Sequence, residues 1–244
     1  MANPSAHVSA RNPAARPFGR ASGPRYGLLL LVLVATYLLS AFTEGRWVNG
    51  VQIVAFVTTL LLALRNALVP SRVARVAVIA LLAGSAIAAG LVAFAPSDAS
   101  LGAAQIWTGL ILLTTVIVIV RRILAETTVT LQSIYAALAA YMIIGLMFAA
   151  FYAAMGRIGG QFFAASQPGN TRTFQYFSFT TLTTLGYGDF TAANNAGRAV
   201  AVMEAMVGQI FLATLVARLV SAFRPARPPE PPEADGPPSQ PTRQ

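Results

Sequence analysis

Residues 180–190 read TTLTTLGYGDF, a polar and glycine-rich segment between two apolar stretches. Hard cations are bound by oxygen ligands, and backbone carbonyls are among these ligands. Successive carbonyls can face one axis if neighbouring residues alternate between backbone conformations of opposite hand, which glycine allows at little cost. Gly186 and Gly188 stand at alternate positions, and the hydroxyl of Thr184 can add a ligand at the inner end. The side chains of Leu185 and Tyr187 would then point away from the axis and pack behind the backbone.

The chain that must position this segment has the composition of a membrane protein. Of its 244 residues, 56% are hydrophobic and 10% are charged, whereas soluble domains carry about 25% charged residues. Six apolar runs are close to the ~20 residues that a helix needs to cross a hydrocarbon core of ~30 Å. They are residues 27–43, 47–64, 73–94, 101–120, 134–155 and 196–223. The predicted fold class is an all-α membrane protein with six transmembrane helices. The chain contains no cysteine, which excludes disulfides and thiolate chemistry.

All 17 basic residues are arginines, and their positions predict the topology. If both termini are cytoplasmic, four arginines lie outside and the others inside, an asymmetry that follows the positive-inside rule. The outer four are Arg46, Arg157, Arg172 and Arg198. The net charge of +9 is therefore explained by arginines that set the membrane topology. For this reason we do not read the charge as a nucleic-acid-binding surface, and we expect no nucleic-acid partner. The first apolar run is long for a signal peptide and lacks a small-residue cleavage site, so we expect it to be retained.

The connection between the last two apolar runs, residues 156–195, would lie outside. It begins with the loop signals GRIGG and SQPGN and continues with TFQYFSFTTLTTL, which is too short to cross a bilayer and too apolar for water. A short re-entrant pore helix satisfies both conditions. Irregular backbone at membrane depth is tolerated only where protein buries it or where it lines a watery path. The segment after this helix is therefore expected to line such a path.

Thr183–Asp189 resembles the signature TTVGYGD of potassium channels, with Leu185 in place of the usual valine. Gly197 and Arg198 open the last apolar run, and Gly208 follows ten residues after Arg198, a spacing seen in bacterial potassium channels. Tyr176 and Phe177 stand where family members often carry two aromatic residues of the pore helix. The detailed resemblance covers residues 174–223, whereas the first four apolar runs match the family only in number and length.

The resemblance implies a homotetramer in the plasma membrane that conducts K⁺ passively through a selectivity filter. Its K⁺ ligands would be the backbone carbonyls of Thr184, Leu185, Gly186, Tyr187 and Gly188. Tyr187 favours potassium, because a sodium-permeant relative would more often have aspartate there. No cofactor and no catalytic residue is expected, since the one histidine, His7, lies in the N-terminal tail. Alternatives are a subunit of a potassium-uptake system and a weakly selective cation channel.

Three polar residues stand around the signature, and two of them allow more than one interpretation. Asp189 can concentrate cations at the outer mouth, can be hydrogen-bonded behind the filter, or can do both, and Tyr176 is the expected hydrogen-bond partner. Thr180 departs from family members that carry a glutamate there to pair with the filter aspartate. Glu204 lies within the last apolar run, where an ionisable side chain is costly and usually functional. It either supports the pore helix by hydrogen bonds to hydroxyls or lines a cavity as a cation-attracting carboxylate.

One face of the last apolar run provides candidates for the cavity and the inner gate. Helical spacing groups four residues there: Gln209, Leu212, Val216 and Val220. The alternative is ordinary helix packing. Glu204 would lie about 140° around the helix from Gln209, on the side of the pore helix. Gly208 resembles the hinge glycine of the family, although it could equally serve only for close helix packing.

We expect four segments: a disordered N-terminal tail (residues 1–24), a four-helix transmembrane domain (25–124), a pore domain (125–223) and a proline-rich disordered tail (224–244). The fourth apolar run has no charge before Arg121 and Arg122 at its inner end. Two arginines at the boundary would move through little of the membrane field, so they are interpreted as topology anchors that contact anionic lipid. We therefore predict little or no voltage gating. The gating stimulus and any cytoplasmic partner are left unassigned.

Overall fold

The computed structural model describes residues 26–42, 57–59, 61, 71–95, 97–126 and 128–222. Among these residues the regular structure is helical, and no β-strand occurs. Both predicted tails and most of the predicted helix at 47–64 lie outside the described residues. The expectations for these parts are therefore not addressed by the structure.

Each described helix coincides with a segment that the sequence predicts to be helical. The helices are α1 (Tyr26–Phe42), α3 (Ser71–Phe94), α4 (Asp98–Ala125), α5 (Leu131–Gly159), α6 (Thr171–Leu182) and α7 (Asn195–Ala222), with a short 3₁₀ turn at Ala164–Ser166. Of the described helices, α4, α5 and α7 are long and apolar enough to cross a membrane. The described part is thus consistent with an all-α membrane protein.

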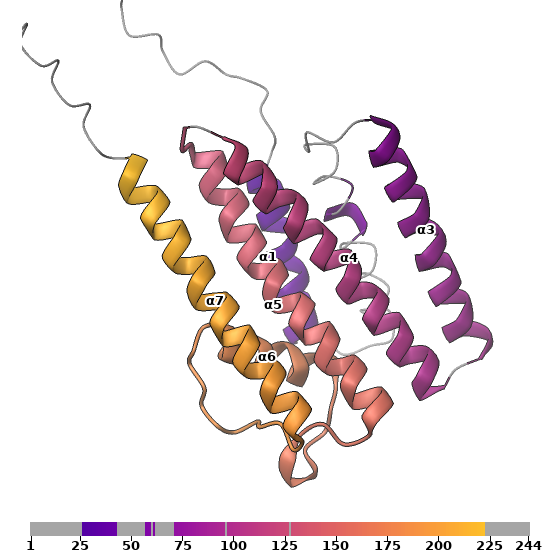
Figure 1. Ribbon diagram of the computed structural model, residues 1–244. Coiled ribbons are helices and arrows are strands. Elements are labelled where there is room, and N and C mark those ends of the chain that lie inside the picture. Colours follow the sequence, from indigo (N-terminus) through magenta and orange to yellow (C-terminus); the bar gives the residue numbers. More distant parts are fainter. Residues whose placement is uncertain are drawn as a thin grey trace, which may run out of the picture.

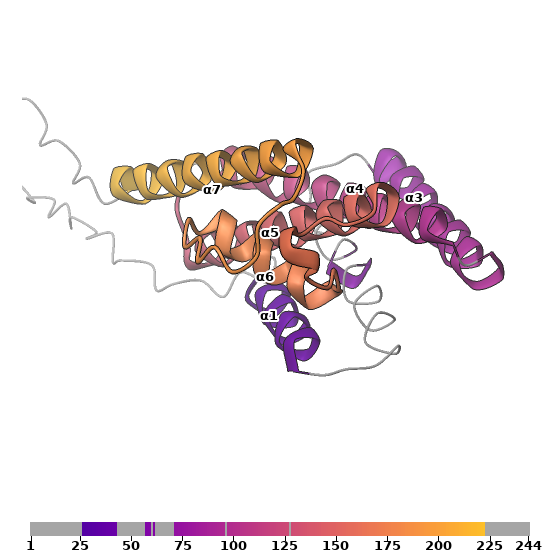
Figure 2. The ribbon, with the colours of Figure 1, turned by 90° about the horizontal axis from the view of Figure 1, so that it is seen from below.

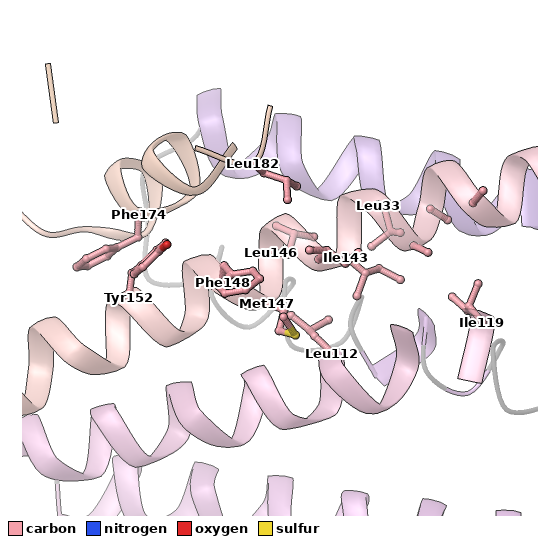
Figure 3. Packing of buried hydrophobic residues seen from close by; sticks show 14 of the residues in the cluster. Leu33, Leu112, Ile119, Ile143, Leu146, Met147, Phe148, Tyr152, Phe174 and Leu182 are labelled. Carbon is pink, nitrogen blue, oxygen red and sulfur yellow. The ribbon is translucent and has the colours of Figure 1, made fainter. Parts of the chain in front are cut away.

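α5 is the central helix of the described part. It contacts α1, α4, α6 and α7, while α3 packs on α4 (Figure 1). In the view of Figure 2, α1 lies on the side of α6 and away from α7, while α6 also contacts α7 directly. Small residues on α5 permit several helices to pack on it, because buried alanines such as Ala136, Ala139 and Ala140 let neighbouring helices approach closely. Larger core side chains fill the space that remains, including Leu112 on α4 and Ile143 and Phe148 on α5 (Figure 3).

The starts of α4, α5 and α6 are fixed by side-chain caps. In α6 the Asn170 side chain accepts a hydrogen bond from the backbone N–H of Thr173 at 3.0 Å, and the Thr173 hydroxyl accepts one from the N–H of Asn170 at 2.9 Å. Ser97 with Ser100, and Thr130 with Ser133, form the same reciprocal arrangement at α4 and α5. Such caps satisfy N–H groups that have no partner within the helix. The cap at Asn170 thus defines the start of α6, the helix that precedes the TTLGYG segment.

Candidate functional site

The C-terminal turn of α6 holds the start of the TTLGYG segment through backbone hydrogen bonds. The carbonyl of Thr180 accepts from the N–H groups of Leu185 at 2.8 Å and Gly186 at 3.1 Å, and the carbonyl of Thr181 accepts from Thr184 at 2.9 Å. No described peptide bond is cis. In a planar trans peptide, a carbonyl points opposite to the N–H of the next residue. The carbonyls of Thr184 and Leu185 are therefore directed away from α6.

Every second residue of the segment has a left-handed backbone. Gly186 has φ +49° and Gly188 has φ +80°, the alternation that the sequence predicts for these two glycines. Thr184 has φ +58°, which a β-branched residue adopts only under strain. Nothing in the residue type indicates this conformation at Thr184. It results from the hydrogen bonds that join the segment to the last turn of α6.

Residues 183–189 are exposed in the single chain. The side chain of Leu185 is 55% exposed and that of Tyr187 is 69% exposed. The sequence predicts that these two side chains pack behind the filter, but the chain itself does not provide this packing. The face of the segment opposite α6 is open as well, so both its carbonyls and these two side chains are available to other molecules.

Asp189 is held on both its side chain and its backbone. The Tyr176 hydroxyl donates a hydrogen bond to the Asp189 carboxylate, and this bond raises the pKa of the Tyr176 phenol above its usual value. Gln167 donates from Nε2 to the Asp189 carbonyl at 2.6 Å. Tyr176 is the partner that the sequence suggests for Asp189, and the role of Asp189 at the outer mouth stays a prediction. Gln167 was not foreseen, because it lies in a loop without a recognisable pattern.

Phe177 belongs to an aromatic cluster behind α6. Its ring lies 5.0 Å from that of Tyr152, 5.5 Å from that of Phe163 and 5.8 Å from that of Phe162, measured between centroids. Backbone bonds join the two flanking loops, since Ala193 donates to the Phe162 carbonyl at 2.8 Å. Edge-to-face aromatic contacts of this kind add to the stabilisation from burial. The cluster therefore fixes α6 between the end of α5 and the start of α7.

Glu204 on α7 is 0% exposed and faces α5 and α6. Its Oε1 lies 2.5 Å from the Ser178 hydroxyl on α6, and its Oε2 accepts from the Tyr152 hydroxyl on α5 at 2.7 Å. Ser178 also lies 2.6 Å from the carbonyl of Gly145 on α5. The helical-wheel argument placed Glu204 on this side, and a hydroxyl of α6 is the kind of partner that the support interpretation requires. Tyr152 and Gly145 were not foreseen as members of the site.

Gly208 marks the closest approach of α7 to α6. A Cβ atom at Gly208 would lie 2.5 Å from the carbonyl oxygen of Leu182, which also accepts from the Tyr141 hydroxyl at 3.1 Å. The close-packing interpretation of Gly208 therefore has a direct structural basis.

The predicted cavity face of α7 is largely uncovered in the single chain. The side chains of Gln209, Val216 and Val220 are exposed, and that of Leu212 is partly exposed. Packing within one chain therefore does not explain the spacing of these residues. The exposed surface next to them includes further apolar side chains such as Met206 and Ile210.

α1 contacts α6 directly, a relationship that the sequence did not suggest. The Ser40 hydroxyl donates to the Gln175 side chain at 2.7 Å, and Arg172 donates from Nε to the Ser40 carbonyl at 3.1 Å. The rings of Tyr37 and Phe179 meet edge to face at 4.9 Å. The first described helix thus supports the helix that precedes the TTLGYG segment.

The predicted inner ends of α4 and α7 meet at Glu126. Its carboxylate lies 3.6 Å from Nε of Arg122 and accepts from the Ser133 hydroxyl at 2.6 Å. Its backbone carbonyl accepts from Arg218 on α7. Arg122 thus takes part in an ion pair at the end of its own helix, while the side chain of Arg121 is exposed.

Residues 155–224 match the family described as ion channel. This segment is similar to ion channels. The matched residues comprise the end of α5, the whole of α6, the TTLGYG segment and α7, which are the elements of the site described above. Comparisons with curated proteins and with solved structures gave no match. The ion channel match and the apolar helices together support ion transport by a membrane-spanning protein.

Proposed function

We propose that this protein is a potassium-selective channel that conducts K⁺ passively through a ring of four identical chains. The observation that carries the proposal is the backbone geometry after α6. The N–H groups of Leu185 and Gly186 turn toward the Thr180 carbonyl, so the carbonyls of Thr184 and Leu185 turn away from it. In potassium channels, the established example, carbonyls of such a loop replace the hydration shell of the ion. Thr184 to Gly188 would be the K⁺ ligands here.

Two further features favour a cation in this position. The C-terminal end of α6 lies next to the segment, and the C-terminus of a helix carries partial negative charge. The exposed side of the segment carries Asp189 at one end and no basic residue between Thr183 and Asp189. Both features lower the energy of a positive ion beside these carbonyls and raise that of an anion.

Four-fold assembly would complete the site, because one chain supplies only one row of carbonyls. A closed ring of identical subunits has cyclic symmetry. The exposed side chains of Leu185 and Tyr187, together with the exposed apolar face of α7, are surfaces that neighbouring subunits would cover. In this assembly Gln209, Leu212, Val216 and Val220 would line the cavity and inner gate below the filter. Gly208 would serve as a hinge as well as a packing position.

The proposed channel has six transmembrane helices per chain, both termini in the cytoplasm of a plasma-membrane protein, and α6 as the re-entrant pore helix. The arginine distribution supports this topology. We propose that voltage has little effect on opening, because Arg121 and Arg122 stand at the end of α4 and Arg122 is paired with Glu126. Conductance measured against voltage should rise far less steeply than in channels with an arginine-rich fourth helix.

The decisive experiment is flux from liposomes that contain only the purified protein. K⁺ should leave the liposomes much faster than Na⁺, and protein-free liposomes provide the control. Equal rates for the two ions would favour the weakly selective cation channel. Absence of flux by the protein alone, restored by other subunits, would favour a component of a potassium-uptake system.

A further inference from the structure

Glu204, Ser178 and Tyr152 join α7, α6 and α5 in one buried hydrogen-bond network. Glu204 is 0% exposed within the single chain, so no neighbouring subunit is needed to bury it. The network has three short contacts: Tyr152 to Glu204 at 2.7 Å, Ser178 to Glu204 at 2.5 Å and Ser178 to the Gly145 carbonyl at 2.6 Å. Among the described residues, no basic side chain forms an ion pair with Glu204.

The three contacts require three protons. The Gly145 carbonyl can only accept, so Ser178 must give its single hydroxyl proton to this carbonyl if the 2.6 Å contact is a hydrogen bond. Tyr152 gives its proton to Oε2 of Glu204. The 2.5 Å contact between Ser178 and Oε1 of Glu204 then has no donor unless Glu204 itself carries a proton. An ionised carboxylate is acceptor-only and would leave two oxygen atoms facing each other without a hydrogen.

We propose that Glu204 is protonated in the conducting state and donates its proton to Ser178, which makes it a positioning residue for the filter. This inference rests on the proposed channel function and names a regulator of the same site, the proton. A neutral carboxylic acid fits the surroundings, because a buried charge without an opposite charge is strongly unfavourable. The proton makes all three contacts favourable at once.

The network reaches the filter through α6. Ser178 lies two residues before Thr180, whose carbonyl holds the N–H groups of Leu185 and Gly186. Loss of the Glu204 proton leaves Ser178 able to satisfy either Gly145 or Glu204 but not both. One of the two contacts then opens, and α6 moves relative to α5 or to α7. The backbone that turns the filter carbonyls outward moves with it.

Among the groups that surround Glu204, Glu204 is the one whose proton we expect to control the network. From α5 it faces Tyr152 and, farther along the helix, Tyr141. From α6 it faces the hydroxyl of Ser178. The arginines that α7 contributes, Arg198 and Arg218, bond to carbonyls of Ala192 and Glu126 near the two ends of the helix. None of the described neighbours supplies a charge that would stabilise an ionised Glu204.

Infrared spectra of the full-length protein in liposomes test the protonation directly. At neutral pH the difference between wild type and Glu204→Gln should contain the carbonyl band of a protonated carboxylic acid. A matched control is Asp98→Asn, which removes an exposed carboxylate, so its difference spectrum should contain carboxylate and amide bands but no acid band. A Glu204→Gln difference that contains carboxylate bands and no acid band would overturn the proposal. If Glu204→Gln does not fold, Tyr152→Phe should shift the acid band of wild type to higher frequency, because the carbonyl loses its donor. An unshifted spectrum would also overturn the proposal.

The pH dependence of K⁺ flux tests the regulatory role. Wild-type flux should fall several-fold as the solution is made alkaline, whereas the flux of Glu204→Gln, normalised to its value at neutral pH, should stay level. The amide cannot ionise, yet it can donate to Ser178 and accept from Tyr152. Asp98→Asn should keep the wild-type profile. The same alkaline fall in Glu204→Gln would overturn the role of Glu204. If the infrared band of protonated Glu204 is present but the protein conducts no K⁺ at any pH, the proposed channel function is contradicted. The protonation of Glu204 would still be supported in that case.

Discussion

The carbonyl oxygen of Leu182 lies so close to Gly208 that a Cβ atom added to this glycine would be 2.5 Å from it. This carbonyl belongs to the last residue of α6 and also accepts a hydrogen bond from the Tyr141 hydroxyl on α5. Three helices thus meet at the point where α6 ends and the TTLGYG segment begins. Any displacement of α7 at Gly208 is transmitted to this point, because backbone atoms cannot move aside as a flexible side chain can.

Gly208→Ala should destabilise the protein for this reason. Overpacking of a close contact costs about 1–3 kcal/mol, and the gain from alanine in a helix, about 1 kcal/mol, offsets only part of it. The matched control is Gly90→Ala in α3, since a Cβ there meets no atom within 4 Å. Thermal unfolding in detergent should show a lower Tm for Gly208→Ala and an equal or higher Tm for Gly90→Ala. Similar Tm values for the two variants would contradict the close contact.

Gly188→Ala should impair K⁺ flux more than it impairs stability. The left-handed backbone of Gly188 costs an alanine roughly 1–2 kcal/mol, and relief of this strain would rotate the adjacent carbonyl. Gly160 provides a control outside the segment, because it also has a positive φ, +82° against +80° at Gly188, and a Cβ at either position meets no atom within 4 Å. Both alanine variants should lose stability, but only Gly188→Ala should lose flux and selectivity for K⁺ over Na⁺. Equal flux in both variants would argue against a conducting role for Gly188.

Tyr176→Phe should loosen the outer end of the segment without disturbing α6. The substitution removes the donor to the Asp189 carboxylate and keeps the ring that packs on Phe190 at 5.8 Å. K⁺ flux should start normally and decline faster during prolonged opening. Tyr135→Phe, a change of the same kind on α5, should leave the time course as in wild type. A Tyr176→Phe time course identical to that of wild type would show that the hydrogen bond to Asp189 does not stabilise the filter.

Ser40→Ala should weaken the contact of α1 with α6. The Gln175 side chain is 5% exposed, and loss of its Ser40 donor should cost about 1–3 kcal/mol of stability. The control is Thr114→Ala on α4, whose exposed hydroxyl bonds only to a carbonyl of its own helix. Chemical denaturation should show a lower midpoint for Ser40→Ala and little change for Thr114→Ala. Equal midpoints would mean that α1 does not support α6 through this bond.

The short helix and the special backbone after it could be predicted from local sequence. An apolar run of the right length forms a helix wherever it packs, and Gly186 and Gly188 permit the left-handed conformation by their residue type. The partner of Asp189 was also within reach of the sequence, because Tyr176 has a suitable donor and lies on the adjoining helix. These inferences depend on residues that are near one another along the chain. The tertiary structure was therefore not needed to suggest a partner for Asp189.

The tertiary structure alone decided which distant side chains meet. Glu204 and Tyr152 are 52 residues apart and Ser40 and Gln175 are 135 apart, so no local pattern pairs them. The left-handed conformation of Thr184 likewise arises from its bond to the last turn of α6, against the preference of a β-branched residue. The sequence by itself determined the helices, their topology signal and the glycine spacing of the TTLGYG segment, because these depend on residue type and spacing. The buried network and the contact of α1 with α6 depend on how the helices pack, which residue type and spacing do not specify.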